Sequence, residues 1–299
     1  MVRHDNRYRS RSSLPVAAWP VLGATVVSLL LVGCSGEQEG RGSVPGPTDP
    51  GMGHVHGLGT DGPNGDVLAA THTGLFRLRE GVEPERVADR RQDTMAFTTD
   101  GDRLLGSGHP DVREDLPAHL GLIQSTDAGQ TWSAVSLQGD ADFHALSVLR
   151  EQVVGWDSLS RAVLASSDGG RSWVTGAELE AVADLEHLPG DGGLLATTAQ
   201  GLLVSQDAGR TFDPFTPAAP RPLLYVETTG DGVTGMDTEG RVWTLVDGGW
   251  GETGTLGAAP AAFTVTADGA LLAAAQEQVL RSEDAQAWTV LADLHGGAG

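Results

Sequence analysis

The feature that most constrains the fold of this chain is an eight-residue phrase that occurs three times in nearly the same form. The copies begin at Ser125, Ser166 and Ser205 and read STDAGQTW, SSDGGRSW and SQDAGRTF. Their aspartates lie 41 and then 39 residues apart. A period of about 40 residues is the length of one four-stranded blade of a β-propeller. The spacing therefore predicts repeated four-stranded sheets arranged around a common centre.

Each residue type in the phrase suits a tight hairpin between the third and fourth strands of a blade. Serine and aspartate oxygens can accept backbone N–H bonds within a turn, glycine permits a positive φ, and the closing aromatic ring can pack between blades. The phrase resembles the Asp-box, or BNR repeat, of sialidase-like propellers. That resemblance implies a structural role for twelve residues: Ser125, Asp127, Gly129, Trp132, Ser166, Asp168, Gly170, Trp173, Ser205, Asp207, Gly209 and Phe212.

Weaker copies continue the same period on both sides of the clear ones. Asp247 follows Asp207 by 40 residues, Asp284 follows by 37 more, and Gly74–Gly81 aligns with Gly121–Ala128. Leading strands are predicted at Val55–Leu58, Met95–Thr98, Phe143–Val148, Val182–Leu185, Leu223–Val226 and Ala262–Val265. Second strands are predicted at Val67–Thr71, Arg103–Ser107, Val153–Trp156, Leu194–Thr198, Val233–Met236 and Leu271–Ala275. We therefore predict an all-β, six-bladed propeller, because a seventh blade would need about 40 further residues.

The N-terminal segment has the features of an export signal. Four arginines precede the apolar run Leu14–Gly33, which ends in the tetrapeptide LVGC at Cys34, the only cysteine of the chain. This tetrapeptide resembles a bacterial lipobox, which implies cleavage before Cys34 and its lipidation. The alternative is an uncleaved membrane helix, since the run is long enough to span a bilayer. We predict a signal peptide at 1–33, a lipidated cysteine with a flexible linker at 34–53, and the propeller at 54–295.

The charge of the chain excludes some partners. Without residues 1–33 the chain has 15 arginines, no lysine and 39 acidic residues, a formal charge of −24. Nucleic acids and anionic lipid surfaces both require a basic footprint, so neither is an expected partner. The acidic surface favours solubility in a high-salt or wall environment, and the alternative is a role in steering cations.

Histidines carry the strongest chemical signal. His56 and His144 are equivalent, each lying two residues before a leucine of a leading strand, and His72 and His109 are equivalent at the ends of second strands. In a blade, the second strand returns to the face where the first begins, so these four imidazoles are predicted to converge on one rim of the channel. One histidine on a strand is usually packed in the core or has the tip of its ring in solvent. Several imidazoles beside carboxylates, however, suit Zn or Cu. We predict a metal or ligand site there.

Acidic residues accompany this predicted rim. Asp157, or its neighbour Ser158, and Asp237 occupy the second-strand position in later repeats, and the long loop Pro110–Gly121 carries Asp115 and His119. The structural alternative for these acids is a solvated loop position in an acid-rich chain.

The resemblance also raises a catalytic alternative. In sialidases a tyrosine activated by a glutamate is the nucleophile, and here Tyr225 and Glu227 share one face of a strand. Asp115, Asp157 and Asp237 are the other weak candidates. The chain departs from the family, however, because no Phe-Arg-Ile-Pro-like segment precedes the first repeat. Arginines for a substrate clamp would have to come from Arg113, Arg161, Arg221 and Arg241.

These observations favour a lipid-anchored binding or assembly propeller on the extracytoplasmic face of a bacterial membrane, with a glycan or an envelope protein as partner. Similar chains include bacterial BNR lipoproteins labelled glycosyl hydrolases and non-enzymatic Asp-box propellers such as sortilin-type receptors. The alternatives are an exo-acting, sialidase-like glycoside hydrolase and a purely structural scaffold, and fold analogy does not decide among them.

Overall fold

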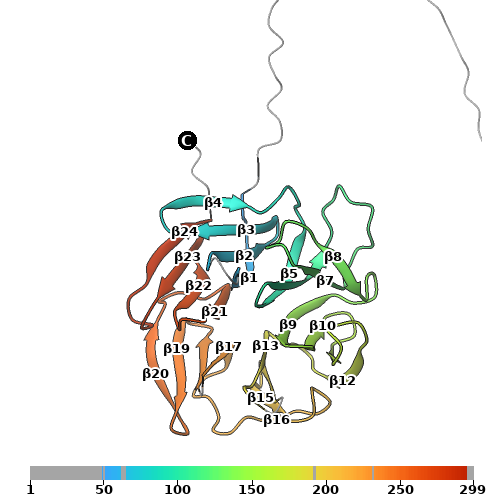
Figure 1. Ribbon diagram of the computed structural model, residues 1–299. Helices are drawn as coiled ribbons and strands as arrows, with labels where there is room; N and C mark the ends of the chain where they lie inside the picture. The colour runs from blue at the N-terminus through green and yellow to red at the C-terminus, as the bar shows by residue number, and fades with distance from the viewer. Residues whose placement is uncertain (1–48, 50, 62–64, 191–192, 231, 295–299) are drawn as a thin grey trace, which may run out of the picture. The chain divides into compact units, whose positions relative to one another are not determined.

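The structure of the chain is a computed structural model that describes residues 49, 51–61, 65–190, 193–230 and 232–294. These residues form six four-stranded antiparallel sheets, and no helix occurs among them. The sheets stand around a common centre as a six-bladed β-propeller, which confirms the predicted fold (Figure 1). No helix suited to crossing a membrane is found in the described part of the chain.

Each blade uses four consecutive strands. The first three blades are β1 Val55–Thr60, β2 Val67–Thr71, β3 Gly74–Arg79 and β4 Val82–Arg86; β5 Asp93–Asp100, β6 Arg103–His109, β7 Leu122–Ser125 and β8 Ser133–Ser136; and β9 Phe143–Leu149, β10 Gln152–Asp157, β11 Ala162–Ser166 and β12 Val174–Glu178. The last three are β13 Asp184–His187, β14 Leu194–Thr198, β15 Gly201–Ser205 and β16 Asp213–Pro214; β17 Leu223–Thr229, β18 Gly232–Asp237, β19 Arg241–Val246 and β20 Gly249–Thr255; and β21 Ala262–Val265, β22 Leu271–Ala275, β23 Gln278–Ser282 and β24 Thr289–Asp293.

The second strand of each blade is the most deeply buried. Every residue of β2, β14 and β22 is buried, and these strands read VLAAT, LLATT and LLAAA. Both faces of such a strand pack against neighbouring blades, so small and apolar residues occupy every position instead of alternating with polar ones. The fourth strands, such as β8, lie at the rim and are largely exposed.

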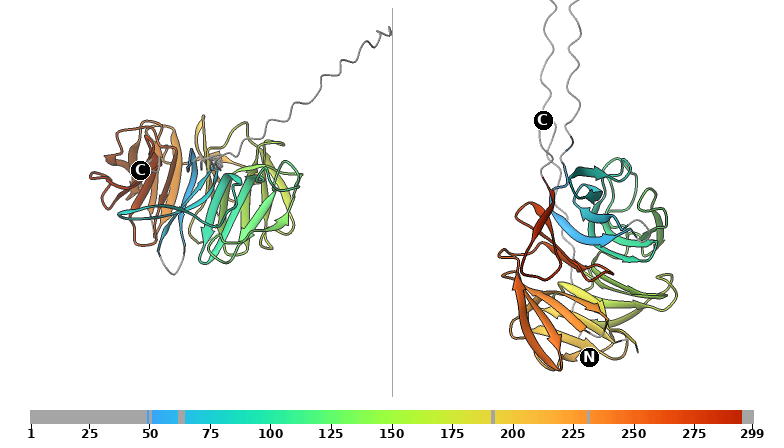
Figure 2. Two further views of the ribbon diagram at one scale, coloured as in Figure 1. Left: turned by 90° about the horizontal axis from the view of Figure 1, so that it is seen from above. Right: turned by 60° about the vertical axis from the view of Figure 1, so that its left-hand side comes forward.

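The hydrophobic core consists of six clusters, and each one joins two neighbouring blades. One cluster closes the ring, because Val55, Leu58 and Phe76 of the first blade pack with Leu272 and Val279 of the last. The first and last sheets lie side by side in all three views (Figures 1 and 2). Each keeps its own four strands, so the ring closes by packing without an exchanged strand.

The three copies of the phrase form the same hairpin. In the second blade, the Ser125 hydroxyl donates to Asp127 Oδ1 over 2.8 Å and accepts the Gly129 amide over 2.9 Å. Asp127 Oδ1 also accepts the Thr131 amide over 2.9 Å. Gly129 has a φ of +84°, and a Cβ there would lie 2.3 Å from Leu75 of the preceding blade. The other copies repeat these bonds with Ser166, Asp168 and Gly170 and with Ser205, Asp207 and Gly209.

The weaker copies differ from this hairpin to different degrees. Ser282 Oγ donates to Asp284 Oδ1 over 3.3 Å, and Asp284 accepts two turn amides, so the last blade keeps part of the arrangement. Asp247 instead has a φ of +52° in the two-residue turn between β19 and β20, where the repeated phrase no longer exists.

The predicted signal peptide at 1–33 and the lipidated Cys34 lie outside the described residues. Of the predicted linker at 34–53, only Asp49 and Gly51–Gly53 are described. Asp49 pairs with Arg86 of β4 and accepts the Gly51 amide over 3.0 Å.

Candidate functional site

A β-bulge near the start of the first strand sets the direction of two histidines. In β1, Val55 pairs with Thr71 and Gly57 with Ala70, which leaves His56 as the extra residue. In β9 the same shift leaves His144 as the extra residue, and in β5 it leaves Met95. Bulges commonly re-aim a side chain, and here His56, Met95 and His144 all line the central cavity.

Besides the bulged residue, two equivalent positions in each of the first three blades supply polar side chains at the channel mouth. The position two residues before the bulged residue holds His54, Asp93 or Asp142, and the end of the second strand holds His72, His109 or Ser158. The backbone pairs these places directly, because the His72 amide donates to the His54 carbonyl and Asp93 pairs with His109. The fold therefore brings these side chains to one end of the strands.

In the first half of the mouth, three imidazoles meet one carboxylate. His56 Nε2 lies 3.3 Å from both ring nitrogens of His72, and the tilted His54 ring has a ring-centroid distance of 4.7 Å to His56. His72 Nδ1 is hydrogen-bonded to Asp93 Oδ1 over 2.8 Å. One nitrogen from each of the three histidines falls within 4.8 Å of the others.

The second half of the mouth is connected to the first through Asp93. Its Oδ2 is 3.4 Å from His109 Nδ1, while His109 Nε2 is 3.9 Å from Asp142 Oδ2. Asp142 also accepts His144 Nε2 over 3.0 Å and lies 3.8 Å from His119 Nδ1. The six histidines and two aspartates are thus a continuous network, which we call the histidine mouth.

Two imidazoles and one aspartate of the histidine mouth have pKa values below their usual ones. Burial, reinforced by the neighbouring His72 and His54, lowers the pKa of His56 to about 4. Burial and His72 also lower the pKa of His54. Burial acts to raise the pKa of Asp142, but the bonds from His144 and Ser158 outweigh it and bring that pKa below its usual value. Neutral imidazole and carboxylate are the forms that bind metal ions.

The four histidines predicted to meet, His56, His72, His109 and His144, do lie in this network. His119 joins them from the loop between β6 and β7, which Asp111 holds by accepting the Arg91 amide over 2.8 Å and pairing with Arg113. Asp115 in the same loop is exposed.

Two predicted acids lie outside the network. Asp157 is buried and accepts the Asp142 and Ser160 amides, and Asp237 is buried and accepts the Arg241 amide and the Trp243 indole. Each aspartate is the last residue of a second strand, and its carboxylate accepts hydrogen bonds from amides of the turn that follows. Ser158 does reach the site, because its hydroxyl donates to Asp142 Oδ2 over 3.0 Å.

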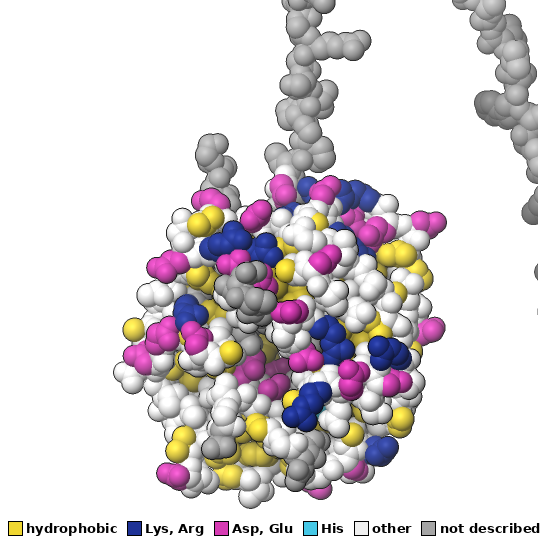
Figure 3. All heavy atoms as spheres, viewed as in Figure 1, with side chains coloured by type: hydrophobic (Ala, Val, Ile, Leu, Met, Phe, Trp, Pro, Cys, Tyr) yellow, Lys and Arg dark blue, Asp and Glu magenta, His cyan; other side chains and the backbone are white. Residues whose placement is uncertain are grey.

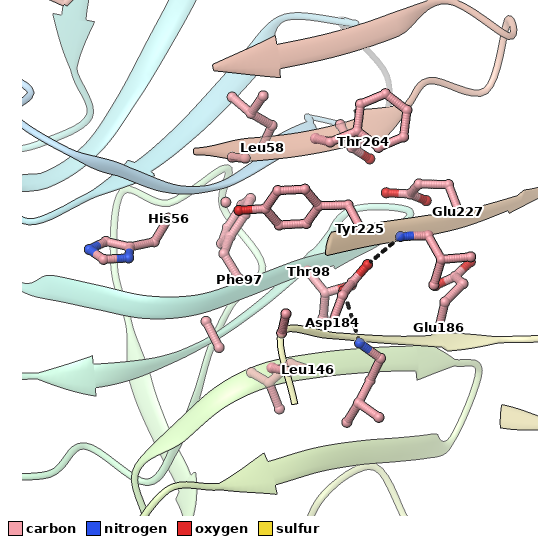
Figure 4. A pocket seen from close by; sticks show the side chains of 18 of the residues that line it. His56, Leu58, Phe97, Thr98, Leu146, Asp184, Glu186, Tyr225, Glu227 and Thr264 are labelled. Carbon is pink, nitrogen blue, oxygen red and sulfur yellow. Dashed lines mark hydrogen bonds between the residues drawn. The ribbon is translucent and has the colours of Figure 1, made fainter. Parts of the chain in front are cut away.

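Below the histidine mouth, the centre of the ring holds a cavity of about 240 Å³. Asp184 and Glu186 of β13 and Glu227 of β17 face it, and each is half-buried because only the channel reaches it (Figure 4). Figure 3 shows acidic side chains at the bottom of the central hollow. No lysine or arginine lines the cavity among the described residues.

These three carboxyl groups have raised pKa values. Burial raises the pKa of Asp184 to about 7, although the Val226 amide donates to it over 2.9 Å. Burial also raises the pKa of Glu186 to about 7, against the opposing bond from the Thr228 hydroxyl. The pKa of Glu227 is raised well above 4.5 by burial and by the charges of Glu186 and Asp184. We call this group the channel acids.

The structure does not pair Tyr225 with Glu227 as a nucleophile and its activator. The Tyr225 hydroxyl donates to the Ala261 carbonyl, and its phenol extends away from Glu227 (Figure 4). Burial, together with Asp184, raises the pKa of Tyr225 above its usual value. Three of the candidate arginines pair with acids that do not line the cavity: Arg113 pairs with Asp89 and Asp111, Arg221 with Glu239, and Arg241 with Glu239 and Asp237.

Sequence reasoning missed five residues that line these sites: Asp93, Asp142, Met95, Asp184 and Glu186. A signal for the first three was present. Asp93 and Asp142 stand where His54 stands in the first repeat, and Met95 stands where His56 does. Asp184 and Glu186 alternate with apolar residues of a leading strand, a pattern that does not distinguish a channel from an outer surface.

The comparisons with known proteins identify the fold class. No family model matches the chain, and no curated protein matches it. Among solved structures, a GH74 enzyme from Niastella koreensis has 17% identity and a TM-score of 0.55, with 80% of this chain and 45% of that one covered. The GH74 xyloglucanase from Xanthomonas campestris has 19% identity and a TM-score of 0.53, with the same coverage.

Another structural neighbour is shorter than the GH74 enzymes and is close to this chain in length. The structure of YCF48 bound to D1 peptide has 16% identity and a TM-score of 0.51, with 82% of this chain and 83% of that one covered. This chain spans less than half of the length of the two GH74 enzymes. At these identities the likeness defines a β-propeller and carries no activity with it.

Proposed function

We propose that this chain is a lipid-anchored, extracytoplasmic binding propeller whose histidine mouth binds a divalent transition metal. The observation that carries the proposal is the continuous network of six histidines and two aspartates at one end of the channel. Three imidazoles from the start of β1 and the end of β2 converge within 4.8 Å, which a packing role for histidine does not require.

The chemistry of the donors favours copper or zinc. Imidazole nitrogen suits both ions, whereas hard ions such as Ca²⁺ prefer oxygen alone. Met95 occupies the bulge position that His56 and His144 hold in neighbouring blades and lines the same cavity. A thioether is a soft ligand, so its presence makes copper the better fit of the two.

Metal content measured by plasma mass spectrometry tests the proposal. The full chain, purified in detergent without a polyhistidine tag, is compared with a variant in which His56, His72, His109 and His144 are all changed to alanine. We expect copper or zinc in near-stoichiometric amounts in the wild type and its loss in the variant. Absence of metal from the wild type after incubation with either ion would overturn the proposal.

The location belongs to the same proposal. The lipobox-like LVGC at Cys34 and the acidic, lysine-free remainder support a protein anchored outside the membrane. Two structural neighbours are named as an extracellular domain and as a bacterial surface component. The three hairpins, with the hydrogen bonds described above, support their assignment as Asp-boxes. In cells supplied with labelled palmitate, the wild type is expected to take up the label and a Cys34→Ser variant is not, and label retained in that variant would contradict lipidation at Cys34.

A glycoside hydrolase is the second candidate, and one observation favours it. The channel acids supply carboxyl groups with raised pKa values in a central cavity, and a general acid of a glycosidase needs such a pKa. Release of a fluorogenic aglycone from a panel of glycosides tests this candidate. We expect Glu186→Gln and Glu227→Gln to abolish any activity found, whereas activity that persists in both variants would exclude the channel acids.

A further inference from the structure

The geometry points to two metal ions at the histidine mouth, held in separate sites that share Asp93. This inference rests on the proposed metal binding and goes beyond it in number, ligands and positioning residue. The first site consists of His54, His56 and His72, and the second of His109, His119 and Asp142. We call them the first-blade site and the loop site.

The first-blade site has the spacing of a coordination shell. His56 Nε2 and His72 Nε2 are 3.3 Å apart. Bonds of about 2.0–2.1 Å to a tetrahedral ion place neighbouring nitrogen ligands about 3.3 Å apart. His54 is exposed at the entrance, so an ion can reach the three nitrogens from solvent, with a further position open for water or another ligand.

The loop site is marked by buried polar atoms that have no partner. Asp142 is 5% exposed, and its Oδ1 makes no hydrogen bond. His119 Nδ1 is also buried and has no hydrogen bond, although it lies 3.8 Å from Asp142 Oδ2. An unpaired buried carboxylate oxygen is costly. A cation held by His119 Nδ1, His109 Nε2 and the Asp142 carboxylate would give these groups a partner, and His109 Nε2 lies 3.9 Å from Asp142 Oδ2.

Asp93 connects the two sites by fixing two tautomers. Its Oδ1 faces His72 Nδ1 at 2.8 Å and its Oδ2 faces His109 Nδ1 at 3.4 Å. A carboxylate accepts only, so both Nδ1 atoms carry the proton and both Nε2 lone pairs are free. The Nε2 atoms then point to different sites, that of His72 to the first-blade site and that of His109 to the loop site. Carboxylate–histidine–metal relays of this kind orient ligands in metalloproteins.

The donors indicate which ions fit. The first-blade site offers three imidazole nitrogens, and the loop site offers two imidazoles with one carboxylate. Both sets suit Cu²⁺ or Zn²⁺, with Cu²⁺ binding more tightly by the general order of divalent affinities. The two sites therefore take borderline divalent ions and differ in the oxygen ligand alone.

Metal stoichiometry with site-selective variants tests the inference. Cu²⁺ and Zn²⁺ are titrated separately into the full chain in detergent, and the bound equivalents are counted. His54→Gln with His72→Gln removes the first-blade site, and His119→Gln with Asp142→Asn removes the loop site. His187→Gln is the matched control, because His187 lies in β13 and belongs to neither site.

We expect two equivalents in the wild type and the control, one in each double variant and none in the combined variant. One equivalent in the wild type that is lost in both double variants would mean a single shared ion, which overturns this inference and leaves the proposed function standing. No bound metal in the wild type would overturn both. Two equivalents that survive in the combined variant would place the ions elsewhere and overturn the assignment.

Asp93→Asn tests the shared carboxylate. We expect affinity to fall by about 10- to 100-fold at both sites, the usual effect of removing such a relay. Asp93→Asn is also added to each of the two double variants, which keep one site each. The visible absorption band of bound Cu²⁺ should shift in both of these proteins, which a loss of fold stability alone would not produce. A change at one site only, or at neither, would show that Asp93 does not serve both histidines.

Discussion

The two faces of the ring use the same repeat in opposite ways. At the hairpin face, Ser166, Asp168 and Gly170 satisfy one another within a few residues, and the other two copies do the same. At the histidine mouth, partners come from different blades, and His119 Nδ1 and Asp142 Oδ1 stay unpaired although they are buried. The hairpin satisfies its polar atoms within one turn of the chain, whereas the mouth leaves these two buried atoms without a hydrogen-bond partner.

Residue identity across the repeats follows this difference. The hairpin holds the same Ser, Asp and Gly in three successive blades, because every copy solves the same local turn. The mouth holds His, Asp and Asp at one equivalent position and His, Met and His at another. Identity across the repeats therefore marks the shared turn, whereas the donors at the mouth vary from blade to blade.

The largest expected effect concerns the hairpin face, where Trp173 is the closing aromatic residue of one copy. The Trp173 ring lies 5.1 Å from Phe143, and its indole N–H donates to Ser136 Oγ over 2.8 Å. Trp173→Ala should lower the free energy of unfolding by about 3 kcal/mol, because it leaves a gap between two blades. Urea unfolding measures this change, with the exposed Val174→Ala as a control expected to stay within about 0.5 kcal/mol. Loss of metal stoichiometry in folded Trp173→Ala would contradict the separation of the two faces.

The second effect concerns metal binding at the histidine mouth. An ion that binds only the folded chain at about 100 times its Kd should raise the free energy of unfolding by about 2.7 kcal/mol per site. In His54→Ala with His119→Ala this gain should disappear, while the metal-free variant should match the metal-free wild type within about 0.5 kcal/mol. Thermal unfolding with and without Zn²⁺ measures both. A metal-free loss above about 2 kcal/mol would make the mouth a structural element.

The third effect concerns the hairpin hydrogen bonds. Ser166 Oγ accepts the buried Gly170 amide over 2.8 Å, so Ser166→Ala leaves that amide unpaired. We expect a loss of about 1–2 kcal/mol in the free energy of unfolding. The exposed Ser167 in the same turn is the control position, and Ser167→Ala should have little effect. Equal losses at the two serines would mean that the hydrogen bond is not what stabilises the turn.

Much of the fold could be predicted from the sequence, because a repeat applies one local rule many times. The predicted strands Val67–Thr71, Leu194–Thr198, Leu271–Ala275 and Ala262–Val265 have the observed bounds. Boundaries were less accurate where a strand continues into polar residues, as in β17, which runs to Thr229. Closure of the ring without strand exchange depends on the packing of distant segments, which local patterns do not contain.

The site was predictable only where residues at equivalent positions were of the same type. His56 and His144 share a position and a residue type, so the repeat placed them together. Asp93 and Asp142 were missed because they are aspartates in places where the first repeat has His54. Asp184 and Glu186 were missed for a different reason: nothing in β13 distinguishes an inward carboxylate from an exposed one in a chain with 40 acidic residues.

The smallest expected effect tests whether the channel acids carry protons. With a pKa raised to about 7, Glu186 in the folded chain holds a proton that the unfolded chain releases near pH 4.3. The folded state thus binds more protons between these values, so the free energy of unfolding falls as pH rises from about 5 to about 8. We expect Glu186→Gln to reduce this fall by about 1 kcal/mol, less than full linkage because the open channel screens the charge. Because the amide can keep bonds to Thr228 and Ser147, the two proteins should converge at low pH. The exposed Glu178→Gln should follow the wild type across the range, and an unchanged slope in Glu186→Gln would mean that Glu186 is ionised throughout.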